Sequence, residues 1–151
     1  MKPAILGLVF LLLLPVLRAQ STRPIHVPDP VMEKFTLLYP DASDVEWIEQ
    51  NGKYLAQFKN YKMSTAVMIS EDGEVLQTET EIKVIALPLE ATSYLTEEVN
   101  ARKIESAAIL ENETGMITFK AVADKEEYWF DGSGQLYTHG TVGLSAGGGG
   151  N

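Results

Sequence analysis

The chain contains no cysteine and only two histidines, His26 and His139. The lack of cysteine excludes disulfide bonds, thiol nucleophiles and thiolate metal sites. A serine such as Ser133 has no obvious general base, because both imidazoles lie near the ends of the expected domain. We therefore predict that the protein is not an enzyme and has no cofactor and no metal site.

Basic residues are also scarce. The chain has 12 lysines and arginines against 21 aspartates and glutamates, and its formal net charge is −9. Nucleic acids and anionic membranes are bound by clustered basic side chains. The charge balance therefore predicts no nucleic-acid partner and no docking on anionic lipid, and it favours a soluble protein with an acidic surface.

Apolar residues gather at the N-terminus. A run from Ala4 to Leu14 follows Lys2 and is closed by Pro15 and Arg18. A charged start, a short apolar core and a small residue such as Ala19 are typical of a secretory signal peptide. The run is shorter than the roughly 20 residues of a membrane-spanning helix. We expect residues 1–19 to be removed, which would leave a periplasmic or secreted protein without stable membrane insertion.

Two segments have the apolar spacing of amphipathic helices. In the first, Asp29 is a possible N-cap, and Val31, Phe35 and Leu38 share one helical face. The second begins at Pro88, and its apolar stripe is Ala91, Tyr94, Leu95 and Val99.

Short stretches of alternating apolar residues follow each helix. Residues 44–60 alternate on both sides of Asn51-Gly52, the strongest short pattern for a hairpin. A third and a fourth strand flank Asp72-Gly73. Four more strands are expected in "KIESAAIL", "GMITFKAVA", "EEYWF" and "QLYT".

The two halves follow the same plan with an offset of about 60 residues. Gly73 corresponds to Gly134, and the strand residues Tyr54, Ala56 and Phe58 correspond to Ile117, Phe119 and Ala121. We infer an internal duplication with repeats at about 29–86 and 87–139. The expected fold class is α+β, with two tandem helix-plus-antiparallel-sheet repeats whose helices pack on one face of the sheet. Residues 20–28 are expected to form a flexible lead, and residues 140–151 a disordered Gly-rich tail.

The segment Asp131-Gly132-Ser133-Gly134 combines oxygen-bearing side chains with two glycines. Such a segment is compatible with a calcium loop, a reactive serine or a hairpin turn. A calcium loop needs carboxylates at alternate positions and a late acidic ligand, and none follows Gly134. In the first half the same place is held by "SEDG", so we predict a turn.

The chain contains, in this order, the motifs "VEW", "GKYLAQF", Asp72-Gly73, "ETEI", Leu87-Pro88 and "YWFDGSGQL". This ordered set resembles the PepSY-like family of exported bacterial proteins, which is also described as β-lactamase-inhibitor-like. The resemblance covers residues 31–137. It implies a two-layer fold and an envelope location, and it transfers no catalytic residue. The chain departs from the family pattern at "KNYKMSTAV", where relatives often have a Gly-containing turn, and at "GMITFKA".

The aromatic run in the last third of the chain offers a candidate binding surface. Neighbouring strand residues point to opposite faces, so if Tyr128 and Phe130 pack under the helices, Trp129 faces out, or the reverse. Exposed aromatics often anchor partners, which makes Trp129 and Tyr128 the candidate partner-binding residues. Six glutamates could form acid–base pairs or metal sites, but no histidine accompanies them and their spacing selects no metal, so we expect a charged fringe. They are Glu79, Glu81, Glu97, Glu98, Glu126 and Glu127.

We therefore predict an exported, non-enzymatic binding module of the bacterial envelope. Its partner would be an unknown envelope protein or peptide, and it could inhibit or regulate a periplasmic protein. The alternative is a small-ligand or metal carrier that uses the acidic surface.

Overall fold

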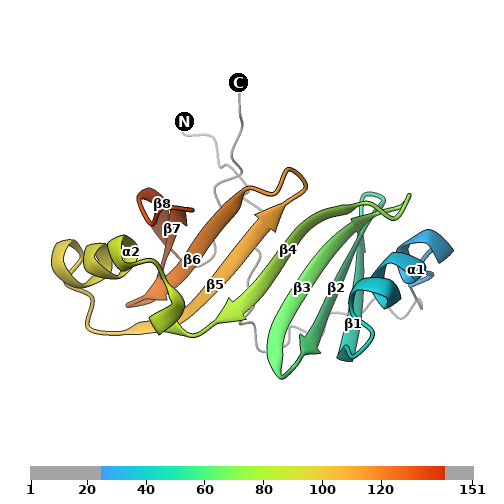
Figure 1. Ribbon diagram of the computed structural model, residues 1–151, viewed down its shortest axis with the longest axis horizontal. Helices are drawn as coiled ribbons and strands as arrows, with labels where there is room; N and C mark the ends of the chain where they lie inside the picture. Colours follow the sequence, from blue (N-terminus) through green and yellow to red (C-terminus); the bar gives the residue numbers. More distant parts are fainter. Residues whose placement is uncertain (1–24, 142–151) are drawn as a thin grey trace, which may run out of the picture. The chain divides into compact units, whose positions relative to one another are not determined.

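The computed structural model describes residues 25–141. It has two short helices and an eight-stranded antiparallel sheet in the order β1-β2-β3-β4-β5-β6-β7-β8, so each strand lies beside its neighbours in the sequence (Figure 1). The predicted signal peptide, residues 20–24 of the predicted lead and residues 142–151 of the predicted tail lie outside the described residues.

The elements alternate between helix and meander. Helix α1 (Asp29–Leu38) precedes the strands β1 (Ser43–Gln50), β2 (Lys53–Asn60), β3 (Met63–Ser70) and β4 (Val75–Ile82). A 3₁₀ turn η1 (Val84–Ala86), helix α2 (Leu89–Ser93) and a π turn η2 (Tyr94–Glu98) come next. The chain then forms β5 (Ile104–Asn112), β6 (Ile117–Ala123), β7 (Glu126–Asp131) and β8 (Leu136–Thr141).

The described chain divides into two compact units. The first unit consists of residues 25–82 and 108–117, and the second consists of residues 83–107 and 118–141. The division lies close to the predicted boundary between residues 86 and 87, except that the end of β5 and the turn after it join the first unit. No helix within residues 25–141 is long and apolar enough to cross a membrane.

Helix α1 forms where prolines set its limits. Pro28 is extended at the N-cap and Pro30 lies in the first turn, where a missing N–H costs nothing. Val31 and Phe35, four residues apart, are both buried and face the strands. Burial of each side chain contributes roughly 1.5–3 kcal/mol, so this face fixes the helix to its unit.

Two details of the α1 prediction were wrong. Asp29 is not the N-cap, because Pro28 occupies that position and Asp29 is the first helical residue. Leu38 is 46% exposed, so the buried face is narrower than the sequence suggested and consists of Val31 and Phe35.

Aromatic rings and small side chains fill the core of the first unit. The ring of Phe35 meets Phe58 edge-on at a centroid distance of 5.0 Å and Trp47 at 5.1 Å. The other buried residues of this core are Val31, Tyr54, Ala56, Val67 and Ile69. The predicted alternation in β2 is confirmed, because Tyr54, Ala56 and Phe58 are the buried residues of that strand.

The second helix is shorter and changes from α-helical to π-helical hydrogen bonding along its length. Pro88 is the N-cap of α2, and the backbone continues as the π turn η2. Ala91 and Leu95 are fully buried, again four residues apart. Tyr94 is half-buried and meets the rings of Tyr128 and Phe130 at centroid distances of 6.4 and 6.0 Å, so α2 and η2 cover that face of β7.

The predicted hairpin at Asn51-Gly52 is confirmed. Both residues have positive φ, 53° and 73°, between the paired residues Gln50 and Lys53. This is the conformation of a type I′ turn, which suits Asn-Gly. The hairpins β2–β3 and β6–β7 also have two-residue loops with positive φ at both positions, but they are built from Tyr61-Lys62 and Asp124-Lys125.

The two glycine turns lie against the starts of the two helices. Gly73 and Gly134 have φ of +85° and +90°, which non-glycine residues rarely adopt. A Cβ on Gly73 would lie 2.8 Å from the carbonyl oxygen of Pro30, and one on Gly134 would lie 2.7 Å from the Cβ of Pro88. Each glycine therefore allows a hairpin to approach the first turn of a helix.

The hairpins that carry these glycines have the same internal geometry. The N–H of Ser70 donates to the carbonyl of Glu74 at 2.8 Å, and the N–H of Asp131 donates to that of Gln135 at 2.9 Å. In β3–β4 the pairing shifts just before Ile69, and in β7–β8 it shifts just before Phe130. The correspondence extends from the turn to the register of the strands around it.

Substituting Ala at Gly73 or Gly134 should destabilise the protein more than the same change at Gly52 or Gly115. All four glycines have positive φ, which costs alanine about 1–2 kcal/mol. At Gly52 and Gly115 the nearest atom to the new Cβ lies 3.9 Å away. The two helix-facing sites should lose about 1–3 kcal/mol more because of overpacking. Urea unfolding of the four variants would measure this, and equal losses at all four sites would contradict the packing argument.

Candidate functional site

The candidate site lies on the side of β6, β7 and β8 that faces away from Tyr94. Strand alternation turns Tyr128 and Phe130 toward α2 and η2, so Trp129 points to the opposite side. On that side Trp129 pairs with Lys120 of β6 and Thr138 of β8. Glu127, two residues before Trp129, shares its face. We call this surface the Trp129 face; its residues are Lys120, Val122, Glu127, Trp129 and Thr138.

The structure separates the two predicted partner-binding residues. Tyr128 is only 5% exposed, and its hydroxyl donates to Glu126 Oε2 at 3.0 Å. Its ring stacks on that of His139 at 5.8 Å. Burial, and after it the bond to the Glu126 carboxylate, raise the pKa of Tyr128 to about 12. Tyr128 belongs to the helix-facing core, while Trp129 is half-buried on the opposite face.

Two charged side chains lie next to Trp129 on this face. Lys120 Nζ lies 5.5 Å from the centroid of the indole ring, within the range of a cation–π interaction. Lys120 and Glu127 are 6% and 3% exposed. The Trp129 face therefore combines a half-buried indole with a buried cation and a buried carboxylate.

The prediction of a charged fringe was wrong for Glu127 and for Glu79, which is 1% exposed. For Glu127 the alternation of strand residues predicts the face on which the side chain lies, but not its burial. In "EEYWF", period-two alternation puts Glu127 on the face of Trp129 and Glu126 on that of Tyr128.

Burial dominates the acid–base behaviour of Glu127. Desolvation raises the pKa of its carboxyl group, because burial disfavours the charged form. The cation of Lys120 and hydrogen bonding to the indole N–H of Trp129 act in the opposite direction and offset part of the increase. The three side chains form one electrostatically coupled group.

The segment at Asp131 is a hairpin turn, as predicted. Asp131 Oδ1 accepts hydrogen bonds from the N–H of Ser133 at 2.9 Å, from its hydroxyl at 2.6 Å and from the N–H of Gln135 at 3.0 Å. These bonds lower the pKa of Asp131, with that from the Ser133 side chain contributing most. The carboxylate and the hydroxyl thus hold their own turn. Within residues 25–141, no three His, Asp or Glu side chains gather as metal ligands would.

Solved structures from Bacteroides species share the arrangement of this chain. A presumed periplasmic protein from Bacteroides eggerthii matches with a TM-score of 0.69 at 15% identity, over 81% of this chain and 94% of that one. A DUF2874 family protein from Bacteroides uniformis matches with a TM-score of 0.67 at 14% identity, over 77% and 90%. A BLIP-like protein from Bacteroides fragilis matches with 0.66 at 21% identity, over 82% and 92%.

The chain has their fold. At these identities the likeness extends to the fold and no further. No protein-family model matches the sequence, and a search of curated proteins finds no relative. The resemblance to the PepSY-like family therefore stays a prediction, while the β-lactamase-inhibitor-like architecture that it implied agrees with the solved structures.

Replacing Glu127 by Gln should change how stability depends on pH. The pKa of Glu127 in the folded protein is raised above its usual value of 4.5, so the folded state holds this proton more tightly than the unfolded state. The resulting stabilisation is present below the usual pKa and is lost as pH rises through the folded-state pKa. Urea unfolding from about pH 3.5 to 7 should show wild type losing stability relative to Glu127→Gln.

A Lys120→Met background provides the matched comparison. Lys120 lowers the pKa of Glu127, so its removal should extend the same relative loss of stability to higher pH. If wild type instead gains stability over Glu127→Gln as pH rises, the attraction of Lys120 outweighs burial and the order of these effects is wrong.

Proposed function

We propose that the protein is an exported, non-enzymatic binding module of the bacterial envelope and that the Trp129 face holds a protein or peptide. The observation that carries the proposal is the half-buried Trp129 among the buried charges of Lys120 and Glu127. The signal-like N-terminus and the presumed periplasmic location of the Bacteroides eggerthii protein support export. The BLIP-like neighbour suggests that binding inhibits or regulates a periplasmic protein.

The Trp129 face is suited to binding because its central ring is already held in place. Lys120 over the indole, together with the hydrogen bonding to Glu127, restricts the rotation of Trp129. A partner that covers a preorganised ring loses less side-chain entropy than one that must order a free side chain. Tryptophan is also one of the residue types, with tyrosine and arginine, that are enriched among side chains that dominate binding energy.

The scaffold of this module is proposed to be a tandem repeat of helix and antiparallel strands. The repeated contact of a turn glycine with a helix start, Gly73 with Pro30 and Gly134 with Pro88, supports it. So do the matching shifts in strand register next to the two turns. The helix-facing core and the opposite face would then be present in each repeat, and the second repeat would have developed its opposite face around Trp129.

Trp129→Ala should abolish or weaken partner binding without unfolding the protein. The experiment immobilises the purified chain, passes the cell-envelope fraction of the source organism over it, and measures the affinity of any retained protein. Loss of an anchoring tryptophan should cost about 2 kcal/mol or more, a weakening of at least tenfold. Tyr61→Ala is the matched control, because Tyr61 is an aromatic that is 77% exposed in a turn of the first unit.

The two tryptophans of the chain allow a direct measurement with the isolated partner. Trp47 lies in the first unit, so Trp47→Phe leaves Trp129 as the single indole fluorophore. Its emission should shift on binding. A partner retained equally by wild type and Trp129→Ala would remove the Trp129 face from the proposal. No retained partner, together with a melting temperature that rises with calcium or zinc, would favour the carrier alternative. Hydrolase or transferase activity in the purified chain would overturn the non-enzymatic assignment.

A further inference from the structure

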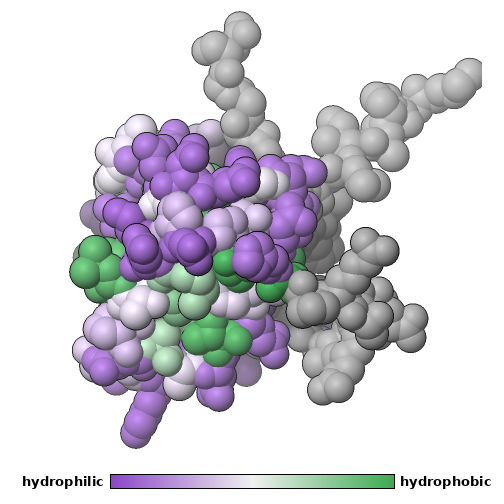
Figure 2. Space-filling model, turned by 90° about the vertical axis from the view of Figure 1, so that its right-hand side faces the viewer, coloured by the Kyte–Doolittle hydropathy of each residue, from purple (hydrophilic) through white to green (hydrophobic). Residues whose placement is uncertain are grey.

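The two outer strands of the sheet differ in how they are protected against pairing with a further strand. Within residues 25–141, β1 and β8 each pair on one side only, so the other side of each carries backbone N–H and C=O groups to which a further strand could bond. On β1 the exposed carboxylates of Asp44, Glu46 and Glu49 and a shift in pairing after Ser43 protect this side. Hydrophilic residues dominate the side of the molecule that carries α1 and β1 (Figure 2).

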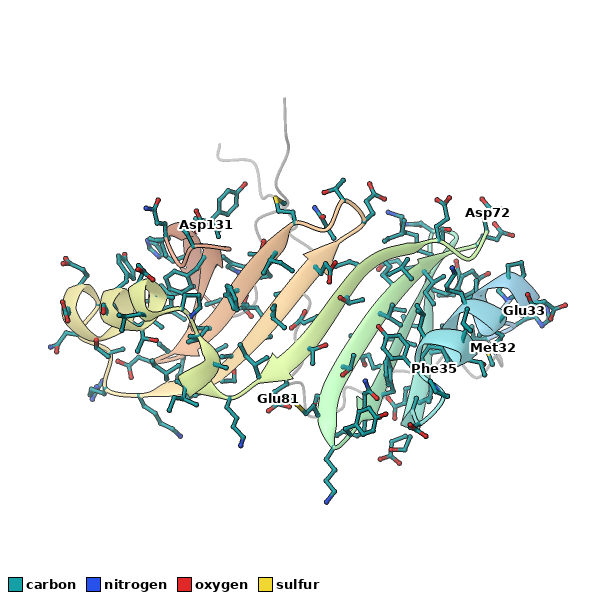
Figure 3. All side chains as sticks on the ribbon, viewed as in Figure 1. Met32, Glu33, Phe35, Asp72, Glu81 and Asp131 are labelled. Atoms are coloured by element: carbon teal, nitrogen blue, oxygen red, sulfur yellow. The ribbon has the colours of Figure 1, made fainter. Side chains whose placement is uncertain are left out.

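Strand β8 has no such protection by charge. Its sequence, LYTHGT, includes no Asp, Glu, Lys, Arg or Pro, and Tyr137 is 68% exposed. The strand follows the turn at Asp131, which is labelled in Figure 3. Its pairing with β7 shifts next to Tyr137 and is then continuous from Thr138 to Thr141. A further strand would therefore meet no charged side chain of β8 and, from Thr138 on, no interruption in the pairing.

The hydrogen bonds of β7 show which backbone groups of β8 point outward. The N–H of Asp131 donates to the carbonyl of Gln135 at 2.9 Å, so Asp131 bonds toward β8. The direction of bonding alternates along a strand, so Trp129 also bonds toward β8, and Tyr128 bonds toward β6. His139 is paired with Tyr128. The backbone N–H and C=O of His139 therefore point away from β7, to the outer side of β8.

The residues of β8 that share the Trp129 face are small. Gly140, which is paired with Glu127, has no side chain, and Thr138, which is paired with Trp129, has a short one. A strand added next to β8 would thus have little side-chain bulk between itself and the indole. A large aromatic or apolar side chain on that strand can lie over the glycine of its neighbour, on the side where Trp129 lies.

We propose that the partner of the Trp129 face contributes an extended segment that pairs with β8 as an additional strand and lays a large aromatic or apolar side chain over Gly140. This inference rests on the function proposed above. Backbone bonds at His139 hold such a segment whatever its sequence, and pockets for alternate side chains give specificity. Pairing of β8 with a second copy is disfavoured, because each copy has a net charge of −9. Residues 142–151, which follow β8, include five glycines, and glycine weakens a strand.

Amide hydrogen exchange with a selected peptide tests the proposal on the wild-type chain. A displayed library of random peptides is selected on the purified protein, and exchange at single amides is followed by NMR with and without the selected peptide. The amide of His139 should exchange at least about tenfold more slowly with the peptide bound. The amide of Gly140 should change less, because it already bonds to β7. A library that yields no peptide able to protect the His139 amide overturns the proposal.

His139→Pro supplies a second readout. Proline removes the outward N–H and none that bonds to β7, so the selected peptide should bind at least about tenfold more weakly. His139→Ala is the matched control, because it lacks the imidazole as well but keeps the N–H, and it should bind like wild type. A peptide that Trp129→Ala releases and His139→Pro retains overturns the added strand and leaves the proposed function intact.

Two further outcomes would assign the outer side of β8 to another occupant and overturn the proposal. Protection of the His139 amide that grows with protein concentration, without peptide, would indicate a second copy. Protection in the free chain that is lost when residues 142–151 are removed would indicate the chain's own C-terminal residues.

Discussion

The close approach of a hairpin glycine to the first turn of a helix is the constraint on which each unit depends. At Gly73 and at Gly134 the space that a side chain would need is occupied by a proline of the helix start. The turn therefore fixes where the helix begins, and the helix fixes the register of the strands that lead into the turn. Both strand pairs shift their register a few residues before the turn glycine, directly before Ile69 in one pair and directly before Phe130 in the other. Helix position and strand register are thus set together.

In each unit a short helical segment covers one side of the strands, and the other side has to be stabilised by different means. In the second unit that side holds Lys120 and Glu127, both buried, next to Trp129. Burying a charge is costly unless other groups compensate it. The indole contributes its ring face to the cation and its N–H to the carboxylate. The same interactions that make this arrangement tolerable also hold the indole in one orientation, which links the stability of the sheet to the binding that we propose for this face.

The sequence predicted the features that rest on special backbone chemistry. Prolines marked both helix starts, Asn51-Gly52 marked a type I′ hairpin, and the glycines of the later turns marked the places that need positive φ. The hairpin loop at Tyr61-Lys62 showed no such pattern, because neither residue favours the positive φ that both adopt. There the pairing of the flanking strands overrides the local preference.

The candidate site was harder to predict than the fold. The alternation of strand residues correctly predicted that Tyr128 and Trp129 point to opposite faces of the sheet. Only the position of α2 and η2 decides which of the two faces the core. The burial of Glu127 and Lys120 depends on the pairing of β6 with β7. The two residues are separated in the sequence, and neither belongs to a recognisable motif. Composition assigns such charged residues to the surface, so their role becomes visible only when the sheet is assembled.

The strand order has a consequence for how the chain reaches this structure. Every strand is next to its sequence neighbour, so the ladders close through short loops and the entropy of loop closure stays low. Such local pairing favours fast folding. Under the proposed export, the chain would cross a membrane unfolded and emerge from one end, and each hairpin could form as soon as its second strand has emerged. Without a cysteine in the sequence, folding needs no oxidation step and does not depend on the redox state of the compartment in which it takes place.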